Sequence, residues 1–226
     1  MRAGGDPTPS SPPDRGLARA RPGKTPPPRR RMPGAQRSAL ILEAALEEFA
    51  RHGYDGASMG RIGAAAGVSR TVLYDYFPGK RALFVALLER THAGLLAHLR
   101  ERIAAEAAME ERMRSATDAF LAFAEHHAEA WSLLFPDHAP IDPDVARDHR
   151  HEQAASNRLL AELIAPDAKR AGIEPQSPVG QAIFALQQAA LLGAVRWWRA
   201  HPGVSRAEIV SAVMGLMWTG IGGLER

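Results

Sequence analysis

Cysteine is absent from this 226-residue sequence, which excludes disulfides, cysteine-ligated zinc, iron–sulfur clusters and thiol nucleophiles. The sequence also lacks a glycine-rich phosphate loop, a Gly-x-Ser-x-Gly nucleophile elbow and a histidine pair at the i, i+4 spacing of zinc proteases. No apolar stretch follows Met1, as a secretory signal would require. We therefore expect a protein that is not an enzyme and that works in the cytoplasm.

Charge is unevenly distributed along the chain. The net charge is +3, yet residues 1–37 carry nine basic and two acidic side chains, together with nine of the 17 prolines. Such a segment cannot bury enough apolar surface to offset the entropy of ordering, so residues 1–35 are expected to form a disordered basic arm. Two interpretations stay open, a solubilising tail or an arm that touches the backbone or minor groove of DNA.

From Gln36 onward the apolar residues recur at helical spacings, and alternating apolar–polar runs are absent. The pattern predicts an all-α fold of about nine helices. Helix caps are expected at Asp142-Pro143 and Ser177-Pro178, and a capping box at 205–208. Breaks between helices are expected at 136–143, 166–176 and 201–204.

The segment 209–224 is apolar on nearly every side, as in a helix that is buried or lies in a membrane. Its length of about 16 residues falls short of the roughly 20 that span a bilayer. We therefore expect this helix to be buried, and we expect no membrane partner.

The most informative part of the chain follows Gly53. Ser58 is expected to cap a short helix over 59–66, after which Gly67 permits a left-handed turn. Ser69 is expected to cap a second short helix over 70–76. Two short helices joined by a tight glycine-containing turn form a helix-turn-helix. The second helix carries four residues that can donate hydrogen bonds, Arg70, Thr71, Tyr74 and Tyr76.

Together with the helix before it, this part of the chain resembles the TetR family of transcriptional repressors. The residues that carry the resemblance, in order and at the family's spacing, are Ile41-Leu42-Glu43-Ala44-Ala45, Phe49-Ala50, Gly53-Tyr54, Ser58-Met59, Ile62, Ala65-Ala66-Gly67-Val68-Ser69, Leu73-Tyr74, Tyr76-Phe77-Pro78 and Lys80. The resemblance implies an all-helical homodimer. Residues 36–81 would form the helix-turn-helix DNA-binding domain, and residues 82–226 a ligand-binding and dimerisation domain.

The resemblance also implies roles for single residues. Arg70 and Thr71 would face base edges, whereas Tyr74, Tyr76 and Lys80 would reach phosphates. Arginine can bind guanine through two hydrogen bonds, and hydroxyl or ammonium groups can hold the DNA backbone. The full DNA-binding set is Ser58, Ser69, Arg70, Thr71, Tyr74, Tyr76 and Lys80.

Three residues of the second helix depart from the family pattern. Thr71 stands where glycine is common, and Val72 stands where threonine is common. Asp75 stands where a basic or aromatic residue is usual, and an acid beside DNA is repulsive unless it pairs with arginine or a cytosine amino group. These departures leave the fold in place and the operator sequence undetermined.

The family's last two helices form a four-helix bundle with those of the partner, and the apolar pattern of 209–224 fits such an interface. The residues expected there are Ile183, Leu186, Ala190, Ile209, Val213, Leu216, Met217 and Gly220. Burial within the single chain is the alternative. Aromatic side chains with a few polar neighbours are expected to line an effector pocket. The candidates are Phe120, Phe123, His127, Trp131, Phe135, Phe184, Gln188 and Trp197, each of which is otherwise an ordinary core residue.

Nine histidines invite a metal-site interpretation. Their spacing matches no helical ligand pair, so solvated histidines are the simpler interpretation, and no metal or cofactor is expected. The function expected is that of a repressor released from a palindromic operator by a small-molecule effector. The alternative is a basic-armed helical interaction protein that binds DNA without sequence preference.

Overall fold

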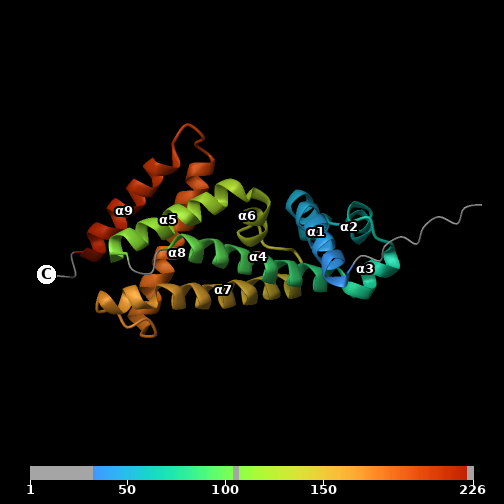
Figure 1. Cartoon of the computed structure of the whole chain (residues 1–226), viewed down its shortest axis with the longest axis horizontal. Coiled ribbons are helices and arrows are strands. Elements are labelled where there is room, and N and C mark those ends of the chain that lie inside the picture. Colours follow the sequence, from blue (N-terminus) through green and yellow to red (C-terminus); the bar gives the residue numbers. More distant parts are fainter. Residues whose placement is uncertain (1–32, 104–106, 223–226) are drawn as a thin grey trace, which may run out of the picture. The chain divides into compact units, whose positions relative to one another are not determined.

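The computed structural model describes residues 33–103 and 107–222, which form nine α-helices and no strand (Figure 1). The all-α prediction is therefore confirmed. The helices are α1 (Gly34–Gly56), α2 (Met59–Ala65), α3 (Arg70–Tyr76), α4 (Lys80–Arg102), α5 (Met109–His126), α6 (Ala128–Leu134), α7 (Pro143–Arg170), α8 (Pro178–Arg199) and α9 (Arg206–Gly222). The predicted basic arm lies outside the described residues except for 33–35, of which Gly34 and Ala35 already belong to α1.

The predicted caps of three long helices are present. The Asp142 carboxylate accepts a hydrogen bond from the backbone N–H of Asp144 at 2.9 Å. The Ser177 hydroxyl accepts one from the backbone N–H of Gly180 at 3.0 Å. At the start of α9, the Glu208 carboxylate accepts from the Ser205 backbone N–H at 2.8 Å, which is the back-bond of a capping box. Each cap satisfies backbone groups that a helix end leaves unpaired.

The predicted break at 166–176 begins too early. Helix α7 continues through Pro166 to Arg170. Proline removes one backbone hydrogen bond and crowds the carbonyl four residues before it, a cost that only the first turn of a helix avoids. The last turn is also tied to α5, because Arg112 Nε lies 3.0 Å from each carboxylate oxygen of Asp167. This tertiary contact keeps the turn helical beyond the proline.

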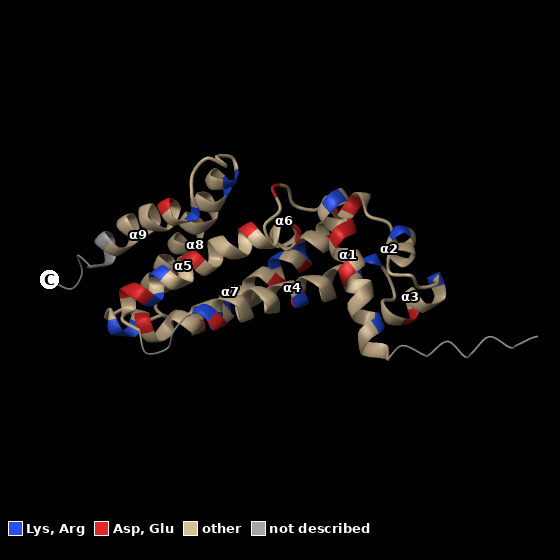
Figure 2. Ribbon diagram, turned by 45° about the horizontal axis from the view of Figure 1, so that its top comes forward, with Lys and Arg blue, Asp and Glu red and all other residues tan. Residues whose placement is uncertain are grey.

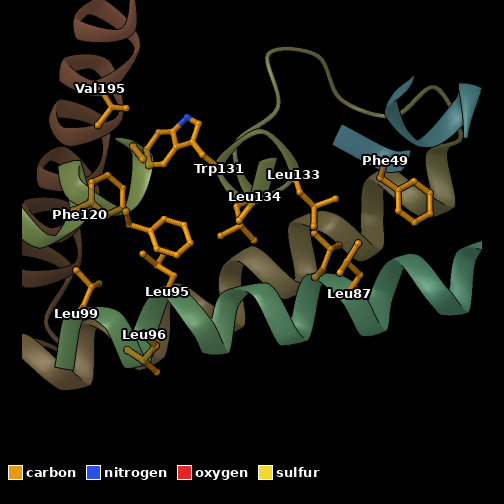
Figure 3. Packing of buried hydrophobic residues seen from close by; sticks show 14 of the residues in the cluster. Phe49, Leu87, Leu95, Leu96, Leu99, Phe120, Trp131, Leu133, Leu134 and Val195 are labelled. Atoms are coloured by element: carbon orange, nitrogen blue, oxygen red, sulfur yellow. The ribbon is translucent and has the colours of Figure 1, made fainter. Parts of the chain in front are cut away.

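Helix α4 is the central element, with α1, α5, α6 and α7 packed against it. A continuous apolar core runs along it, from Phe49 of α1 past Leu87 and Leu95 to Phe120 of α5 and Val195 of α8 (Figure 3). Helices α8 and α9 pack on each other and on the outer side of α5. The helix-turn-helix therefore sits on the same core as the helices that follow it.

Candidate nucleic-acid interface and ligand cavity

Helices α2 and α3 have the local geometry of a helix-turn-helix. Gly67 adopts a φ of +65°, the left-handed conformation that glycine takes without strain. The backbone N–H of Val68 donates to the carbonyl of Gly63 at 3.0 Å and closes the turn. The Ser69 hydroxyl accepts from the backbone N–H of Val72 at 3.3 Å, so the predicted cap of α3 is confirmed.

A buried carboxylate fastens α2 to α1. Glu48 Oε1 accepts from the backbone N–H of Ser58 at 2.9 Å and from Arg61 Nε at 2.7 Å. The hydrogen bond from Arg61 lowers the pKa of Glu48 below 4.5, although burial alone would raise it. Arg61 also donates to the carbonyl of Gly56 at 2.7 Å. Ser58 stands at the N-cap position of α2, but its hydroxyl makes no capping bond.

Helix α3 turns one face inward and leaves the other to solvent. Leu73 is buried, whereas five of its neighbours are exposed: Ser69, Arg70, Thr71, Tyr74 and Asp75. The Arg70 guanidinium lies 5.5 Å from the centroid of the Tyr74 ring, within reach of a cation–π contact. Figure 2 shows basic residues on both α2 and α3. The outer face of α3 thus combines a cation, hydroxyl groups and one carboxylate.

Two of the residues expected to reach phosphates have contacts within the chain. Lys80 Nζ donates to the carbonyls of Asp55 and Ala57 at 3.2 and 3.1 Å, and it lies 4.6 Å from the centroid of the Tyr54 ring. Lys80 therefore ties the start of α4 to the loop between α1 and α2. Tyr76 is half-buried, and its hydroxyl group lies close to Gly34 at the start of α1. The distance is 3.2 Å from the hydroxyl oxygen to the point where a Cβ atom would stand if residue 34 had a side chain.

The helix-turn-helix is also held to α7. Arg81 Nε lies 2.5 Å from the Asp148 carboxylate, and the Arg81 hydrogen bond lowers the pKa of that carboxyl group. In the loop before α7, the backbone N–H of Ile141 donates to Asp55 Oδ2 at 3.0 Å. Two separate contacts therefore connect the start of α7, and the loop before it, with the elements around the helix-turn-helix.

A cavity of about 160 Å³ lies between α4, α5, α7 and α8, with one residue of α9 in its wall. Three of the eight candidate pocket residues line it, namely Phe120, Phe184 and Gln188. Two residues expected at the dimer interface, Ile183 and Met217, also line it. The rest of the lining is mostly apolar: Leu99, Ile103, Met109, Arg112, Met113, Ala116, Thr117, Leu160, Ala161, Leu163, Ile164, Asp167, Ala168, Ala171, Ile173, Pro175, Gly180, Gln187 and Leu191.

The other five pocket candidates do not line this cavity. Trp131 is buried behind Phe120, with their ring centroids 5.2 Å apart, and Phe135 packs on the same pair. Phe123 and His127 pack on each other 4.9 Å apart. The remaining candidate is Trp197, which is exposed and stacks on His201 at 4.0 Å. These five residues are core or surface aromatics.

The most polar part of the cavity wall was not identified from the sequence. Arg112 and Asp167 stand 55 positions apart in the chain and meet only because α5 packs beside the end of α7. Arg112 lies in a charged run with Glu110, Glu111 and Arg114, so the local sequence does not single it out as an arginine with a buried partner. The sequence does not say which acid that partner is.

The predicted dimer residues divide between two environments. Ile209 and Val213 are buried within the chain, on the side of α9 that packs on α5, so they are not open to a partner as we expected. Leu186 of α8 and Leu216 of α9 remain 70% and 74% exposed. Ala190 is also exposed, and Gly220 lies beyond Trp218, the last residue whose side chain is described. An apolar face is therefore left on α8 and α9.

Over residues 33–103 and 107–222, no three His, Asp or Glu side chains are gathered so that they could hold a metal ion. Helix α8 alone among the described helices is long and apolar enough to cross a membrane by length and composition.

Residues 41–87 match the model of the bacterial regulatory proteins of the tetR family. The chain is similar to the HTH-type transcriptional activator FasR of Mycolicibacterium smegmatis, with 33% identity over 138 residues, which are 61% of this chain and 63% of FasR. It is 42% identical over 94 residues to the HTH-type transcriptional regulator RutR of Escherichia coli K12, covering 40% of this chain and 44% of RutR. The matched part is therefore less than two thirds of each relative, and both relatives are regulators of transcription.

The fold is shared with solved structures of low sequence identity. One is the transcriptional regulator FadR of Bacillus subtilis in complex with stearoyl-CoA, with a TM-score of 0.64 and 16% identity over 79% of this chain and 96% of FadR. At this level of identity the likeness shows the fold alone.

Proposed function

Because the chain belongs to the TetR family of bacterial regulatory proteins, we propose that it is a repressor that binds a palindromic DNA operator and leaves it when a small molecule binds. The observation that carries this proposal is the outer face of α3, where Arg70, Thr71 and Tyr74 are exposed together. The capped start of α3 and the Glu48–Arg61 contact hold this face in one orientation. A protein that acts in this way on bacterial DNA is proposed to work in the cytoplasm.

The roles at DNA follow from exposure and hydrogen bonding. Arg70 and Thr71 are proposed to meet base edges, and Ser69, Tyr74 and Tyr76 to meet phosphates. An ammonium group has three N–H groups, and Lys80 uses two on carbonyl oxygens. The third is proposed to reach a phosphate. The backbone N–H of Ser58 is occupied by Glu48, which leaves its hydroxyl for a phosphate.

A palindromic operator requires two copies of α3 about one helical turn of DNA apart, at roughly 34–36 Å. We propose that two chains associate through the exposed apolar face of α8 and α9. Leu186 and Leu216 are largely exposed on it, and Ala190 and Gly193 are small enough to let helices approach closely. The same pairing would cover the apolar surface that gives α8 its membrane-like composition.

The dimer is tested by introducing a charge into the exposed face. Leu186→Glu combined with Leu216→Glu is expected to convert the dimer to a monomer in light scattering, because burying two carboxylates in an apolar interface is unfavourable. Ile141→Glu is the matched control, since Ile141 is 85% exposed in the loop before α7. A monomeric wild-type protein, or a doubly substituted protein that stays dimeric, would contradict this interface.

The DNA-binding role is tested by selecting bound sequences from a random duplex pool. A palindromic consensus bound about 10³-fold or more tightly than bulk DNA is expected. Arg70→Ala should cost about 1–3 kcal/mol at one base position and relax the preference there. Lys80→Ala should weaken binding to all sequences and lower the salt slope by about one. The control is Arg158→Ala, an exposed arginine of α7.

The results separate the repressor from its alternative. Binding without sequence preference, steeply reduced by salt, would instead identify a basic-armed interaction protein. If Arg70→Ala left the preference unchanged, the proposed base contacts would be wrong. If an effector tightened operator binding, the protein would need its ligand to bind the operator, and the proposed release by the ligand would be wrong.

A further inference from the structure

The wall of the cavity carries an internal ion pair. The side chains of Arg112 and Asp167 are 9% and 17% exposed, and Arg112 Nε lies 3.0 Å from each oxygen of the Asp167 carboxylate. Both residues line the cavity, and no other charged side chain among the described residues does so. The cavity is therefore lined by one positive and one negative group that neutralise each other.

This pairing determines which ligand charge the cavity tolerates. A buried anion gains most from an arginine whose charge is not already balanced, and here the Arg112 Nε–H and its positive charge are already paired with the Asp167 carboxylate. An anionic ligand would leave two carboxylates competing for one cation in an apolar space, which is costly. Arg170 also contacts Asp167, at 3.3 Å, but its side chain is 59% exposed and lies outside the cavity lining.

The cavity also offers uncharged hydrogen-bonding groups. Gln187 and Gln188 of α8 line it, and neither side-chain amide bonds to another of the described residues. An amide supplies both donors and an acceptor. These two side chains can therefore satisfy a neutral polar group on a ligand, such as an amide, ester or hydroxyl.

The remaining lining sets the size and nature of the ligand body. A cavity of about 160 Å³ compares with the roughly 150 Å³ that holds one benzene ring. Met109, Met113 and Met217 line it, and methionine side chains adapt readily to the shape of a guest. A compact aromatic or a medium-length alkyl chain matches this volume.

We infer that the cavity binds an uncharged, mainly apolar small molecule whose single polar group is held by Gln187 and Gln188, and that it rejects ligands that bring an anionic group inside. This inference rests on the proposed function, because it names the chemical class of the effector. It concerns ligand binding alone, so it is tested without DNA.

The experiment compares two probes of the same length, octanamide and octanoate, by calorimetric titration of the full chain at pH 7.5. Octanoate is fully ionised there because carboxyl groups have pKa values near about 4. Octanamide is expected to bind at least tenfold more tightly than octanoate. Equal affinities, tighter binding of octanoate, or no binding of octanamide would each overturn the inference.

Substitutions locate the binding. Gln188→Leu and Gln187→Leu should each weaken octanamide binding about threefold to tenfold, the usual value of one hydrogen bond. Gln181→Leu is the control on the same helix, since Gln181 is exposed and outside the cavity lining. If neither cavity glutamine mattered, the assigned polar contact would be wrong.

Asp167→Asn gives the sharpest result, because it leaves Arg112 without its carboxylate. Octanoate should then bind at least tenfold more tightly than it binds the wild-type protein, while octanamide changes little. Circular dichroism checks that this variant folds, and the glutamine variants test the inference if it does not. Failure of these titrations would leave operator selection unaffected, so failure of the inference and failure of the proposed function remain distinguishable.

Discussion

Replacing His92 with leucine should stabilise the protein, and increasingly so as the pH falls. His92 lies on α4 and is only 6% exposed, and neither ring nitrogen has a hydrogen-bond partner. A neutral imidazole carries one donor and one acceptor, and both are left unsatisfied here. An unsatisfied buried polar group costs about 1–3 kcal/mol. Leucine has a similar volume and no polar atom, so it removes this cost.

The pH dependence follows from the pKa of His92, which burial, assisted by the neighbouring His149, lowers from 6.5 to about 4. Between these values the unfolded chain takes up a proton that the folded protein does not. Stability is therefore fully present above pH 6.5 and declines as the pH falls toward about 4. At about 1.4 kcal/mol for each pKa unit, His92 alone accounts for about 3 kcal/mol of this decline.

The assay is urea unfolding followed by circular dichroism at a series of pH values from 7.5 down to 4.5, at one protein concentration. His92→Leu should raise the free energy of unfolding by about 1–3 kcal/mol at pH 7.5, and the gap to the wild type should widen on acidification. His149 also has a lowered pKa through burial, so the variant retains part of the decline.

The control is His138→Leu, which changes an exposed histidine of the loop before α7 and should alter neither stability nor its pH dependence. Parallel stability curves for the wild type and His92→Leu would refute the argument. So would a variant that is less stable at every pH, because His92 would then be making a favourable contact.

Three further predictions concern other parts of the chain. Gly180→Ala should lower the free energy of unfolding by roughly 1–3 kcal/mol, because a Cβ at this position would lie 2.2 Å from the Glu174 carbonyl oxygen. Gly94 has open space where a Cβ would stand, so Gly94→Ala should raise the free energy of unfolding by about 1 kcal/mol. Thermal unfolding compares the two variants, and equal effects on stability would contradict the close approach of the Glu174 carbonyl to Gly180. In urea unfolding, Glu48→Ala should lower the free energy of unfolding by about 1–3 kcal/mol. Because the pKa of Glu48 in the folded protein lies below 4.5, the difference in stability between this variant and the wild type should shrink as the pH falls through and below 4.5. Deleting residues 1–32 removes eight basic and two acidic side chains, so it should weaken DNA binding and reduce the salt dependence of that binding. An unchanged DNA affinity would favour a solubilising tail. A large drop in melting temperature would assign the arm a structural role.

Local signals allowed the sequence to predict the helix-turn-helix and the helix caps. The glycine at 67 and the serine at 69 determine the turn within a few residues. Asp142 and Ser177 likewise act on neighbouring N–H groups. Such contacts depend on short stretches of chain, so they can be inferred from residue types and spacing.

Features that depend on distant partners were not predictable in the same way. Pro166 reads as a helix break, yet α7 continues because its end is held by α5. Val213 and Leu216 both belong to the segment 209–224, which is apolar on nearly every side, and only packing on α5 separates buried Val213 from exposed Leu216. The aromatic residues differ for the same reason, since Phe120 lines the cavity while Trp131 stands behind it.

The short helix α6 has a consequence for how the two ends of the protein communicate. Phe120 forms part of the cavity wall, Trp131 of α6 packs on its far side, and α6 in turn packs against α1. A guest that displaces the Phe120 ring would therefore push on a seven-residue helix that also packs against α1 and α4. Under the function proposed above, α6 would be the element that passes a displacement of Phe120 on to α1.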